Sequence, residues 1–522
     1  MKPNQEKDCC LMWRQLLPDF ERDGATLQSQ LRSAIVAAIL DARIASGSRL
    51  PSSRNLAVML KVARNTVVLT LEQLVCDGYL EARPRSGYYV RQGSPAQPEP
   101  VQSEHAARST RVAWGKRLAA TPQRDKWLEK PADWQRYPYP FVYGQFDPKM
   151  FPVAEWRECS RLALSVGEIH NWASDAIEHD DDALVDQLIR RVLPRRGIAA
   201  HPSEILITLG TQHALYMLAE LLIKPGTGVA MEEPGYMDAR NICARRQARI
   251  VPVPMDADGA LASGHLKDVS YLYCTPSHHC PSGATLSTER RIALLQEAAR
   301  NDVVIIEDDY DAEIQYNGQP SPALKAIDRH DQVVYIGSVS KVISPGLRVG
   351  YMVGNPELIS AARKLRRLMI RHPPSNNQRA LALFIAQGHY DSLLRRTTSI
   401  LSERAELLSD ALTRHLPDFE FRRPSGGASI WAKVPDGIDP LRLRREAMDA
   451  GVLIESGEPF FSGSAHEHFI RLGYASIAPE KIEAGIIALA QVVKKCRPAR
   501  SNHSIRLLRP SEYRAVAMAM AS

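Results

Sequence analysis

The stretch YIGSVSKVISPGLRVGY, which spans Tyr335–Tyr351, places a single lysine directly after a short apolar run. Ser338 and Ser340 stand beside Lys341 on its N-terminal side, and Arg348 follows it seven residues later. A short apolar run that meets a polar turn is typical of a buried strand. In open α/β sheets, ligands bind at the carboxyl ends of the strands. The stretch therefore predicts a ligand site at a strand end, with an amine beside it.

The surrounding sequence repeats this pattern of apolar runs and polar turns. Runs such as EILITL, GVAM, VSYLYC, DVVIIE and VVYIG alternate with helical stretches such as STERRIALLQEAARN. This alternation predicts an α/β domain with a largely buried sheet. After EILITL, Gly210, Thr211 and Gln212 open a helix whose free amide hydrogens suit a phosphate group. After GVAMEEP, Tyr236 offers an aromatic face for stacking on a planar ring.

The strand ends together carry what pyridoxal 5'-phosphate (PLP) requires of a protein. Its aldehyde needs an amine for a Schiff base, its ring nitrogen needs a carboxylate and its phosphate needs donors. We assign Lys341 to the aldehyde, Asp308 to the ring nitrogen and Tyr310 to the ring hydroxyl. The predicted phosphate donors are Ser338, Ser340, Arg348 and Thr211. A lone lysine near a strand is usually a solvated surface residue, but the matching groups at the other strand ends argue for the cofactor.

The N-terminal part of the chain predicts three helices and a hairpin. Residues 27–38 carry apolar side chains at helical spacing, and a second short helix follows Pro51, with Ser52 or Ser53 as its N-cap. A third helix is expected over about Arg64 to Asp77. The segment YLEARPRSGYYV then predicts two strands joined by a turn. This order of elements predicts a winged helix-turn-helix.

Positive charge is concentrated in the same N-terminal segment. The whole chain has a formal net charge of +7 at pH 7. Residues 25–95 contain nine Lys or Arg against four Asp or Glu, a local net charge of +5. A local excess of this kind favours a polyanion such as DNA, although solvated basic faces are also common.

A chain of 522 residues exceeds what one core usually holds, so more than one domain is expected. The apolar runs are too short to cross a bilayer, and MKPNQEKDCC lacks the apolar region of a signal peptide. Eight scattered cysteines fit a reducing compartment, which predicts a cytoplasmic protein with no membrane partner. The predicted parts are an N-terminal extension at 1–24, a DNA-binding domain at 25–93, a linker at 94–137, a PLP-binding domain at 138–495 and a flexible tail at 496–522.

The segments TPSHHCPSG, EDDYDAEIQY and GSVSKVISPGLRVGYMV, preceded by LPSSRNLAVMLKVARNTV, resemble the MocR subfamily of GntR-type bacterial regulators. The resemblance covers about Thr26 to Val493, and the joint occurrence of both halves is highly specific. It implies a winged helix-turn-helix fused to an α/β fold-type-I aminotransferase-like domain that binds PLP. It also implies a homodimer in which each DNA-binding domain lies near the partner's aminotransferase-like domain.

The resemblance also implies roles for individual residues. Arg54 and Arg64 match family positions that meet DNA, and Asn65 and Thr66 add short polar donors at a helix start. Arginine can read guanine or hold a phosphate. In the fold-type-I pattern, the arginine of RLGYA, here Arg471, anchors the substrate carboxylate through its planar fork. The alternative role for this arginine is a structural ion pair.

Several positions depart from the family pattern. Ala63 stands where the family usually has a capping serine, and Lys61 replaces a turn glycine. Arg85 takes the place of a glycine at the wing tip, where its charge could approach the DNA backbone or minor groove. The usual family pattern YxDPxG has a tyrosine and a glycine that are missing from the segment SDAIEHDDDALVDQL. A phosphate contact from the neighbouring subunit is therefore without its usual residues.

The text CTPSHHC admits a second interpretation. It places Cys274, His278, His279 and Cys280 in a short span, and these are ligand types of zinc. Two prolines in the same span, together with the family pattern, instead predict a fixed turn beside the cofactor. We therefore predict no metal.

The sequence predicts a PLP-dependent transcription regulator that senses a small amine or amino acid and binds double-stranded operator DNA. Two alternatives are an active PLP-dependent aminotransferase that carries a DNA-binding module, and a sensor of PLP itself. Asp238 stands two residues after Tyr236. If its side chain points into the site, it would disfavour a second carboxylate, so we expect a monocarboxylic amino acid or related amine anchored by Arg471. Asp238 could equally face solvent.

Overall fold

The computed structural model describes residues 26–92, 113–118, 127–261, 264–316, 321–463 and 468–497. The chain divides into two units, residues 1–121 and 122–522, and the division lies inside the predicted linker. The predicted N-terminal extension lies outside the described residues, as do most of the predicted linker and, beyond Arg497, the predicted tail. Within the described part of the chain, no helix is both long and apolar enough to cross a membrane.

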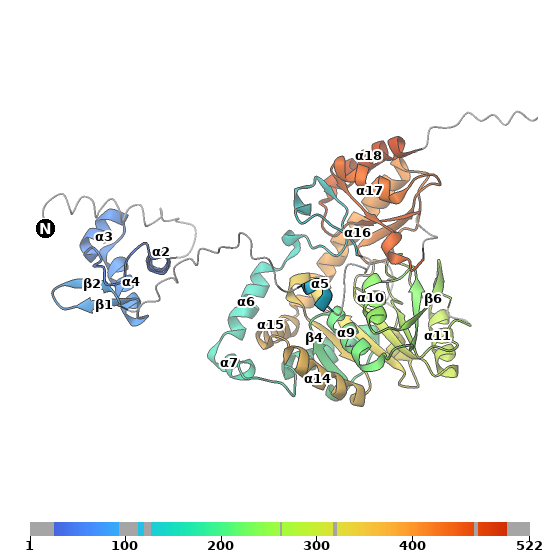
Figure 1. Ribbon diagram of the computed structural model, residues 1–522, viewed down its shortest axis with the longest axis horizontal. Helices are drawn as coiled ribbons and strands as arrows, with labels where there is room; N and C mark the ends of the chain where they lie inside the picture. The colour runs from blue at the N-terminus through green and yellow to red at the C-terminus, as the bar shows by residue number, and fades with distance from the viewer. Residues whose placement is uncertain are drawn as a thin grey trace, which may run out of the picture. The chain divides into compact units, whose positions relative to one another are not determined.

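The first unit contains the predicted three helices and hairpin (Figure 1). The elements are α2 (Leu27–Leu40), α3 (Ser53–Leu60), α4 (Arg64–Cys76), β1 (Leu80–Arg83) and β2 (Gly87–Val90), followed in the same unit by the short helix α5 (Trp114–Arg117). Leu31, Ile35, Leu56 and Leu71 are buried where the three helices meet. The hydroxyl of Ser52 accepts the Asn55 amide hydrogen at 3.2 Å, so Ser52 is the N-cap of α3. The winged helix-turn-helix fold is confirmed.

The three departures from the family pattern have structural counterparts in this unit. Lys61 ends α3 with φ 54°, and Arg85 at the wing tip has φ 60°. Both residues are therefore in the left-handed region that favours glycine, at a cost of about 1 kcal/mol each. Ala63 precedes α4 and provides no side-chain cap.

The second unit is built around an eight-stranded sheet with the order β4-β11-β10-β9-β8-β5-β6-β7. Strands β5, β6, β8, β9 and β10 run parallel, whereas β11 is antiparallel to both β4 and β10. The bounds are β4 (Ile205–Thr208), β5 (Gly228–Glu233), β6 (Arg249–Asp256), β7 (Gly259–Ala260), β8 (Tyr271–Cys274), β9 (Val304–Asp309), β10 (Val333–Ser338) and β11 (Gly350–Val353). The predicted α/β domain is confirmed.

Helices cover both faces of this sheet (Figure 1). On one face, α9 (Thr211–Leu222), α10 (Met237–Arg245) and α14 (Pro356–Ile370) pack on buried strand residues such as Met231 and Ile306. On the other face, α11 (Thr288–Arg300) and α12 (Leu324–Ile327) pack on Leu272 and Ile305. The remaining helices of this part are α6 (Val153–Ala163), α7 (Val166–Trp172), α8 (Asp182–Gln187), α13 (Ser340–Ile343) and α15 (Ser375–Ala386).

The long helix α16 (His389–His415) leads into a smaller C-terminal layer. There a four-stranded sheet of order β12-β13-β16-β15 packs with α17 (Pro440–Asp449) and α18 (Pro479–Cys496). Its strands are β12 (Glu420–Phe421), β13 (Ser429–Lys433), β15 (Glu455–Ser456) and β16 (Phe469–Gly473). A separate pair joins β3 (Tyr139–Pro140) to β14 (Val452–Leu453), so the chain just after the predicted linker runs along this layer.

Candidate functional site

Lys341 lies in α13, directly after β10 ends at Ser338. Its amine is 4.6 Å from the ring centre of Tyr143 and 5.5 Å from that of Tyr310. Burial lowers the pKa of Lys341, and the negative charge of Asp311 opposes that effect. A lowered pKa favours the neutral amine, which is the form that attacks an aldehyde. Tyr143, Asp311 and Lys341 line the same cavity of about 530 Å³.

Asp308 lies one residue before the end of β9 and is buried. The hydroxyl of Tyr273 donates to its Oδ2 at 2.9 Å, whereas its Oδ1 is buried and has no hydrogen-bond partner in the described part of the chain. Burial raises the pKa of this carboxyl to about 7. A buried acceptor that lacks a partner inside the protein is suited to a donor on a ligand. A protonated ring nitrogen is such a donor, so Asp308 fits the PLP ring.

The predicted phosphate-binding groups converge at the start of α9. Gly210 precedes this helix with φ 77°, and a Cβ added there would lie 3.0 Å from Nη2 of Arg348. The same Nη2 donates to the Leu209 carbonyl at 2.8 Å. Register along the sheet pairs Ser338 with Gly350, and Gly350 with the last residue of β4. A cradle of this kind, at a helix start with free amide hydrogens, suits a phosphate.

The other residues predicted for the cofactor have defined surroundings. The Tyr236 hydroxyl lies 2.9 Å from Gln212 Oε1 and 3.1 Å from Asp238 Oδ2. Asp238 is thus engaged on the side of Gln212, at the start of α9. The Tyr310 hydroxyl donates to the His278 carbonyl at 3.1 Å. Thr211 is the first residue of α9, and the side chain of Ser340 lies outside what the structure describes.

Arg471 is buried on β16 and has a fixed orientation. Its Nε donates to Glu455 Oε2 at 2.7 Å, and the two residues are directly opposite each other on β15 and β16. Its guanidinium carbon lies 4.2 Å from the ring centre of Tyr143 and 4.6 Å from that of Phe460. The Tyr143 ring therefore contacts both Arg471 and the amine of Lys341. Arg471 therefore forms an ion pair with Glu455, which is the alternative role considered from the sequence. The pair uses the Nε edge of the guanidinium.

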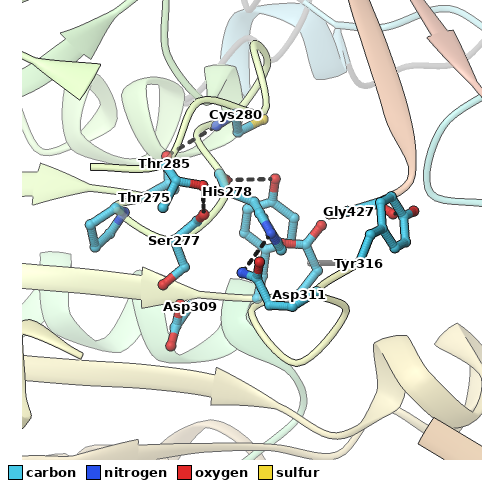
Figure 2. Close-up of polar contacts among 12 residues, drawn as sticks. Thr275, Ser277, His278, Cys280, Thr285, Asp309, Asp311, Tyr316 and Gly427 are labelled. Carbon is cyan, nitrogen blue, oxygen red and sulfur yellow. Dashed lines mark hydrogen bonds and ion pairs between the residues drawn. The ribbon is translucent and has the colours of Figure 1, made fainter. Parts of the chain in front are cut away.

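A second polar network is built around His278 and Asp311 (Figure 2). The amide of Gln315 lies 3.0 Å from Nε2 of His278, and Nδ1 of the same ring lies 3.0 Å from Asp311 Oδ1. Because the Gln315 Nε2 is a donor, His278 Nε2 accepts and its Nδ1 carries the proton toward Asp311. Asp311 Oδ2 also lies 3.5 Å from the Tyr143 hydroxyl. The His278 ring thus fixes the orientation of the Asp311 carboxylate, which faces Lys341.

Three of the four side chains considered as zinc ligands have separate partners. The His279 ring lies between Ser282 Oγ at 2.6 Å and the Pro234 carbonyl at 2.9 Å, and burial lowers its pKa to about 4. His278 is taken by the network described above. The Cys280 thiol lies 3.9 Å from Nη1 of Arg471. Among the described residues, no group of three or more His, Cys, Asp or Glu side chains could hold a metal ion.

The residues predicted for DNA lie together on the first unit. Arg54 is in the first turn of α3, and Arg64 and Asn65 begin α4, where all three are exposed. Thr66 follows them and is half-buried. Arg85 is exposed at the tip of the hairpin. These positions provide donors at two helix starts and at the wing.

Sequence reasoning missed several groups around the ligand cavity. Tyr143 and Phe460 stack on Arg471, and Glu455 is its acidic partner. No motif pointed to these three residues, because each lies outside the strand ends of the large sheet. Asp311 was visible only as part of the acidic text EDDYD, and its position beside Lys341 depends on the His278 contact.

Comparison with known proteins agrees with the two-part architecture. Residues 170–489 match the family described as aminotransferase class I and II, and residues 27–90 match the family described as bacterial regulatory proteins, gntR family. The chain is 40% identical over 475 residues to the HTH-type transcriptional regulator TauR of Rhodobacter capsulatus, covering 90% of this chain and 97% of that protein. It is 30% identical over 481 residues to the probable rhizopine catabolism regulatory protein MocR of Rhizobium meliloti, covering 90% and 94%.

A solved structure with the same fold as the second unit is an enzyme. The α-aminoadipate aminotransferase of Thermus thermophilus, complexed with N-(5'-phosphopyridoxyl)-L-leucine, has a TM-score of 0.66 at 27% identity and covers 74% of this chain and 99% of that one. A winged helix joined to a fold-type-I aminotransferase domain defines a class of regulators built on an enzyme fold. The chain belongs to the MocR subfamily of GntR-type transcriptional regulators.

Proposed function

We propose that the aminotransferase-like domain of this regulator binds PLP and senses a small amine or amino acid, and that the winged helix binds operator DNA in response. The observation that carries the proposal is the buried Oδ1 of Asp308, which has no hydrogen-bond partner among the described residues and lies at the same sheet edge as Lys341. Burying an acceptor without a partner costs about 1–3 kcal/mol, so a ligand donor is the natural explanation.

The proposed division of labour follows from the contacts of each residue. Lys341 would hold the PLP aldehyde, Asp308 the ring nitrogen and Tyr310 the ring hydroxyl. The Gly210–Gln212 turn and Arg348 would hold the phosphate, together with Ser338 and Ser340. PLP supplies an aldehyde that a free amine can exchange onto. The chain's own residues orient that amine, exclude water through the burial of the cavity and lower the pKa of Lys341.

Arg471 is proposed to bind the effector carboxylate. Its guanidinium is fixed between the rings of Tyr143 and Phe460, and its Nε edge is already used by Glu455. A planar fork held in one orientation binds a carboxylate with little loss of side-chain freedom. Asp311 lines the same cavity as Lys341 and acts electrostatically on its amine, whereas Asp238 is tied to Tyr236. A monocarboxylic amino acid or related amine remains the proposed effector.

A working aminotransferase is the second candidate, and the TM-score of 0.66 to an enzyme of that activity favours it. Multiple-turnover transfer of an amino group to a keto acid would support the enzyme. A third candidate, a sensor of PLP itself, would bind operator DNA according to PLP alone. We further propose that this regulator is a homodimer. We also propose that it lies in the cytoplasm, where operator DNA is found.

The experiment that tests the proposal uses the purified full-length protein and random genomic fragments. DNA is selected with the PLP-free protein, with PLP, and with PLP plus a panel of amino compounds, and the bound fragments are sequenced. A fragment set that changes when an amine is added to the PLP-loaded protein supports the regulator. The same fragments with the same affinity in all three conditions would contradict ligand sensing.

A further inference from the structure

The end of the predicted linker lies against the effector site. We call residues Trp127–Pro131, in the last part of the predicted linker, the strap. Leu128 of the strap is half-buried and packs against a small cluster of buried side chains, Met237, Cys280 and Phe460. The strap is therefore docked on this unit through an apolar contact.

The apolar cluster under Leu128 borders the proposed ligand groups. The Phe460 ring lies 4.6 Å from the guanidinium carbon of Arg471, and the Cys280 thiol lies 3.9 Å from its Nη1. The rings of Tyr236 and Tyr310 pack against the same cluster. Leu128 thus forms part of the wall around the place where an effector attached to Arg471 would put its apolar side chain.

Two charged residues also hold the strap. Nη2 of Arg444, on α17, donates to the Glu129 carbonyl at 2.8 Å, and its Nη1 lies 3.7 Å from the Glu129 carboxylate. Lys130, Arg444 and Glu455 line one small cavity of about 290 Å³. Burial lowers the pKa of Lys130, and the negative charge of Glu455 opposes this effect, so ammonium and carboxylate interact.

Glu455 therefore connects the strap to the effector anchor. Its carboxylate accepts from Nε of Arg471 at 2.7 Å and from the Tyr143 amide at 3.2 Å, and it also attracts Lys130. Without an effector, the charges of Arg471 and Glu455 nearly cancel. A carboxylate bound to Arg471 leaves this group with a net negative charge, which increases the attraction on the Lys130 ammonium.

We propose that the strap is part of the effector site and carries its signal: an amino acid bound at Arg471 packs against Leu128 and tightens the strap through Glu455 and Lys130. The inference rests on the proposed function, since it needs an amino compound at this site. The strap is continuous in sequence with the chain that leads to the winged helix. A strap that is held more tightly on the aminotransferase-like domain shortens the part of the linker that can move between the two domains. Effector binding thereby gains a route to the DNA-binding domain.

The test uses three compounds on the full-length protein: PLP, N-(5'-phosphopyridoxyl)-L-leucine, and the matching derivative of 3-methylbutylamine, which lacks only the carboxylate. Hydrogen exchange of the strap amides is measured with each compound. We expect the leucine compound to slow this exchange about tenfold, and PLP or the carboxylate-free compound to slow it much less. Equal exchange with all three compounds would overturn the proposal.

Variants separate the two contacts. Leu128→Ala should weaken binding of the leucine compound about tenfold, the loss expected from a half-buried leucine, while PLP binding changes less than about twofold. Lys130→Met should reduce the ratio between the affinities of the leucine compound and its carboxylate-free form. Leu164→Ala, at a leucine that is 59% exposed and outside the strap, is the matched control.

The outcomes for the inference and for the proposed function differ. If the wild type binds the leucine compound and Leu128→Ala binds it equally well, the strap proposal is wrong and the sensor function stands. If the wild type binds none of the three compounds, both fail. Operator affinity measured with saturating leucine compound adds a readout, because Leu128→Ala should lose most of the ligand-dependent change seen in the wild type.

Discussion

Arg471 and Glu455 are paired across neighbouring strands, with Nε of the arginine 2.7 Å from Oε2 of the acid. Both side chains are buried, and the rings of Tyr143 and Phe460 lie on the guanidinium. The pair therefore has a structural role as well as the proposed anchoring role. The two roles predict different outcomes when the pair is changed.

Arg471→Ala should destabilise the domain by about 3 kcal/mol or more, because it leaves the Glu455 carboxylate buried without its partner. The double variant Arg471→Met with Glu455→Gln should recover most of that stability, since no unpaired charge remains. It should still bind an amino acid more weakly, while an amine without a carboxylate binds as before. Calorimetry and spectral titration provide the two measurements. Unchanged amino acid affinity in the double variant would mean that Arg471 is only structural.

Lys341→Ala should abolish the yellow colour and the borohydride-reducible link to PLP. Operator binding should persist in some form, because the winged helix has its own core of residues such as Leu31, Leu56 and Leu71. Absorbance spectra and peptide mapping after reduction measure the link. Lys364→Ala, an exposed lysine on α14, is the control that should stay yellow. A reducible link in Lys341→Ala would show that another lysine holds the cofactor.

Asp308→Asn should change how the stability of the PLP-free protein depends on pH. Burial raises the folded-state pKa of Asp308 to about 7, above its ordinary value of 3.8. Between these values the folded state binds more protons than the unfolded state, so this group makes stability fall as pH rises from about 4 to about 7. The variant removes that contribution, so its melting temperature relative to wild type should rise between pH 5 and pH 8.

The same Asp308 substitution should weaken PLP binding, because asparagine cannot neutralise a protonated ring nitrogen. Asp410→Asn, at a carboxylate that is 55% exposed, is the matched control for both measurements. A melting-temperature difference that does not change with pH would mean that Asp308 is already ionised in the folded PLP-free protein.

Arg64→Ala should weaken operator binding by about 1–3 kcal/mol and leave the PLP spectrum unchanged. The wild-type affinity should fall steeply with salt, since Lys and Arg contacts to phosphates release counterions. Fluorescence anisotropy at several salt concentrations measures both effects. Arg43→Ala provides a control in the same unit, because Arg43 is paired with Asp41 in the turn after α2. Equal loss in both variants would point to a nonspecific charge effect.

Ala63→Thr should stabilise the winged helix by about 1 kcal/mol, because its hydroxyl can accept a free amide hydrogen at the start of α4. Ala63 already has the extended conformation of an N-cap, with φ −62° and ψ 138°, and lacks a side-chain acceptor. Ala63→Val has nearly the same shape and no hydroxyl, so it should not stabilise. Thermal unfolding of the full chain measures the difference, and equal effects of Thr and Val would contradict the capping explanation.

Parts of the fold and site were predictable because the relevant contacts are short-range or follow a general rule. The winged helix needs only apolar spacing, the Ser52 cap and turn residues within one short segment. Lys341 follows strand β10 and Asp308 lies near the end of strand β9, and the carboxyl ends of neighbouring parallel strands meet at one edge. By contrast, the sequence left open whether Asp238 points into the site or faces solvent, and in the structure its carboxylate accepts a hydrogen bond from the Tyr236 hydroxyl.

The sequence by itself determined the two-part organisation, the buried strands and the identity of the groups at their ends, because periodicity and residue chemistry are local properties. Only the tertiary structure decided which distant side chains surround those groups. Tyr143 and Glu455 are 312 residues apart in the chain, yet their contact at 3.2 Å places both beside Arg471. Leu128 packs against a cluster that includes Phe460, which lies still farther away along the chain. Such contacts depend on how the layers pack, and no local pattern in the sequence encodes that packing.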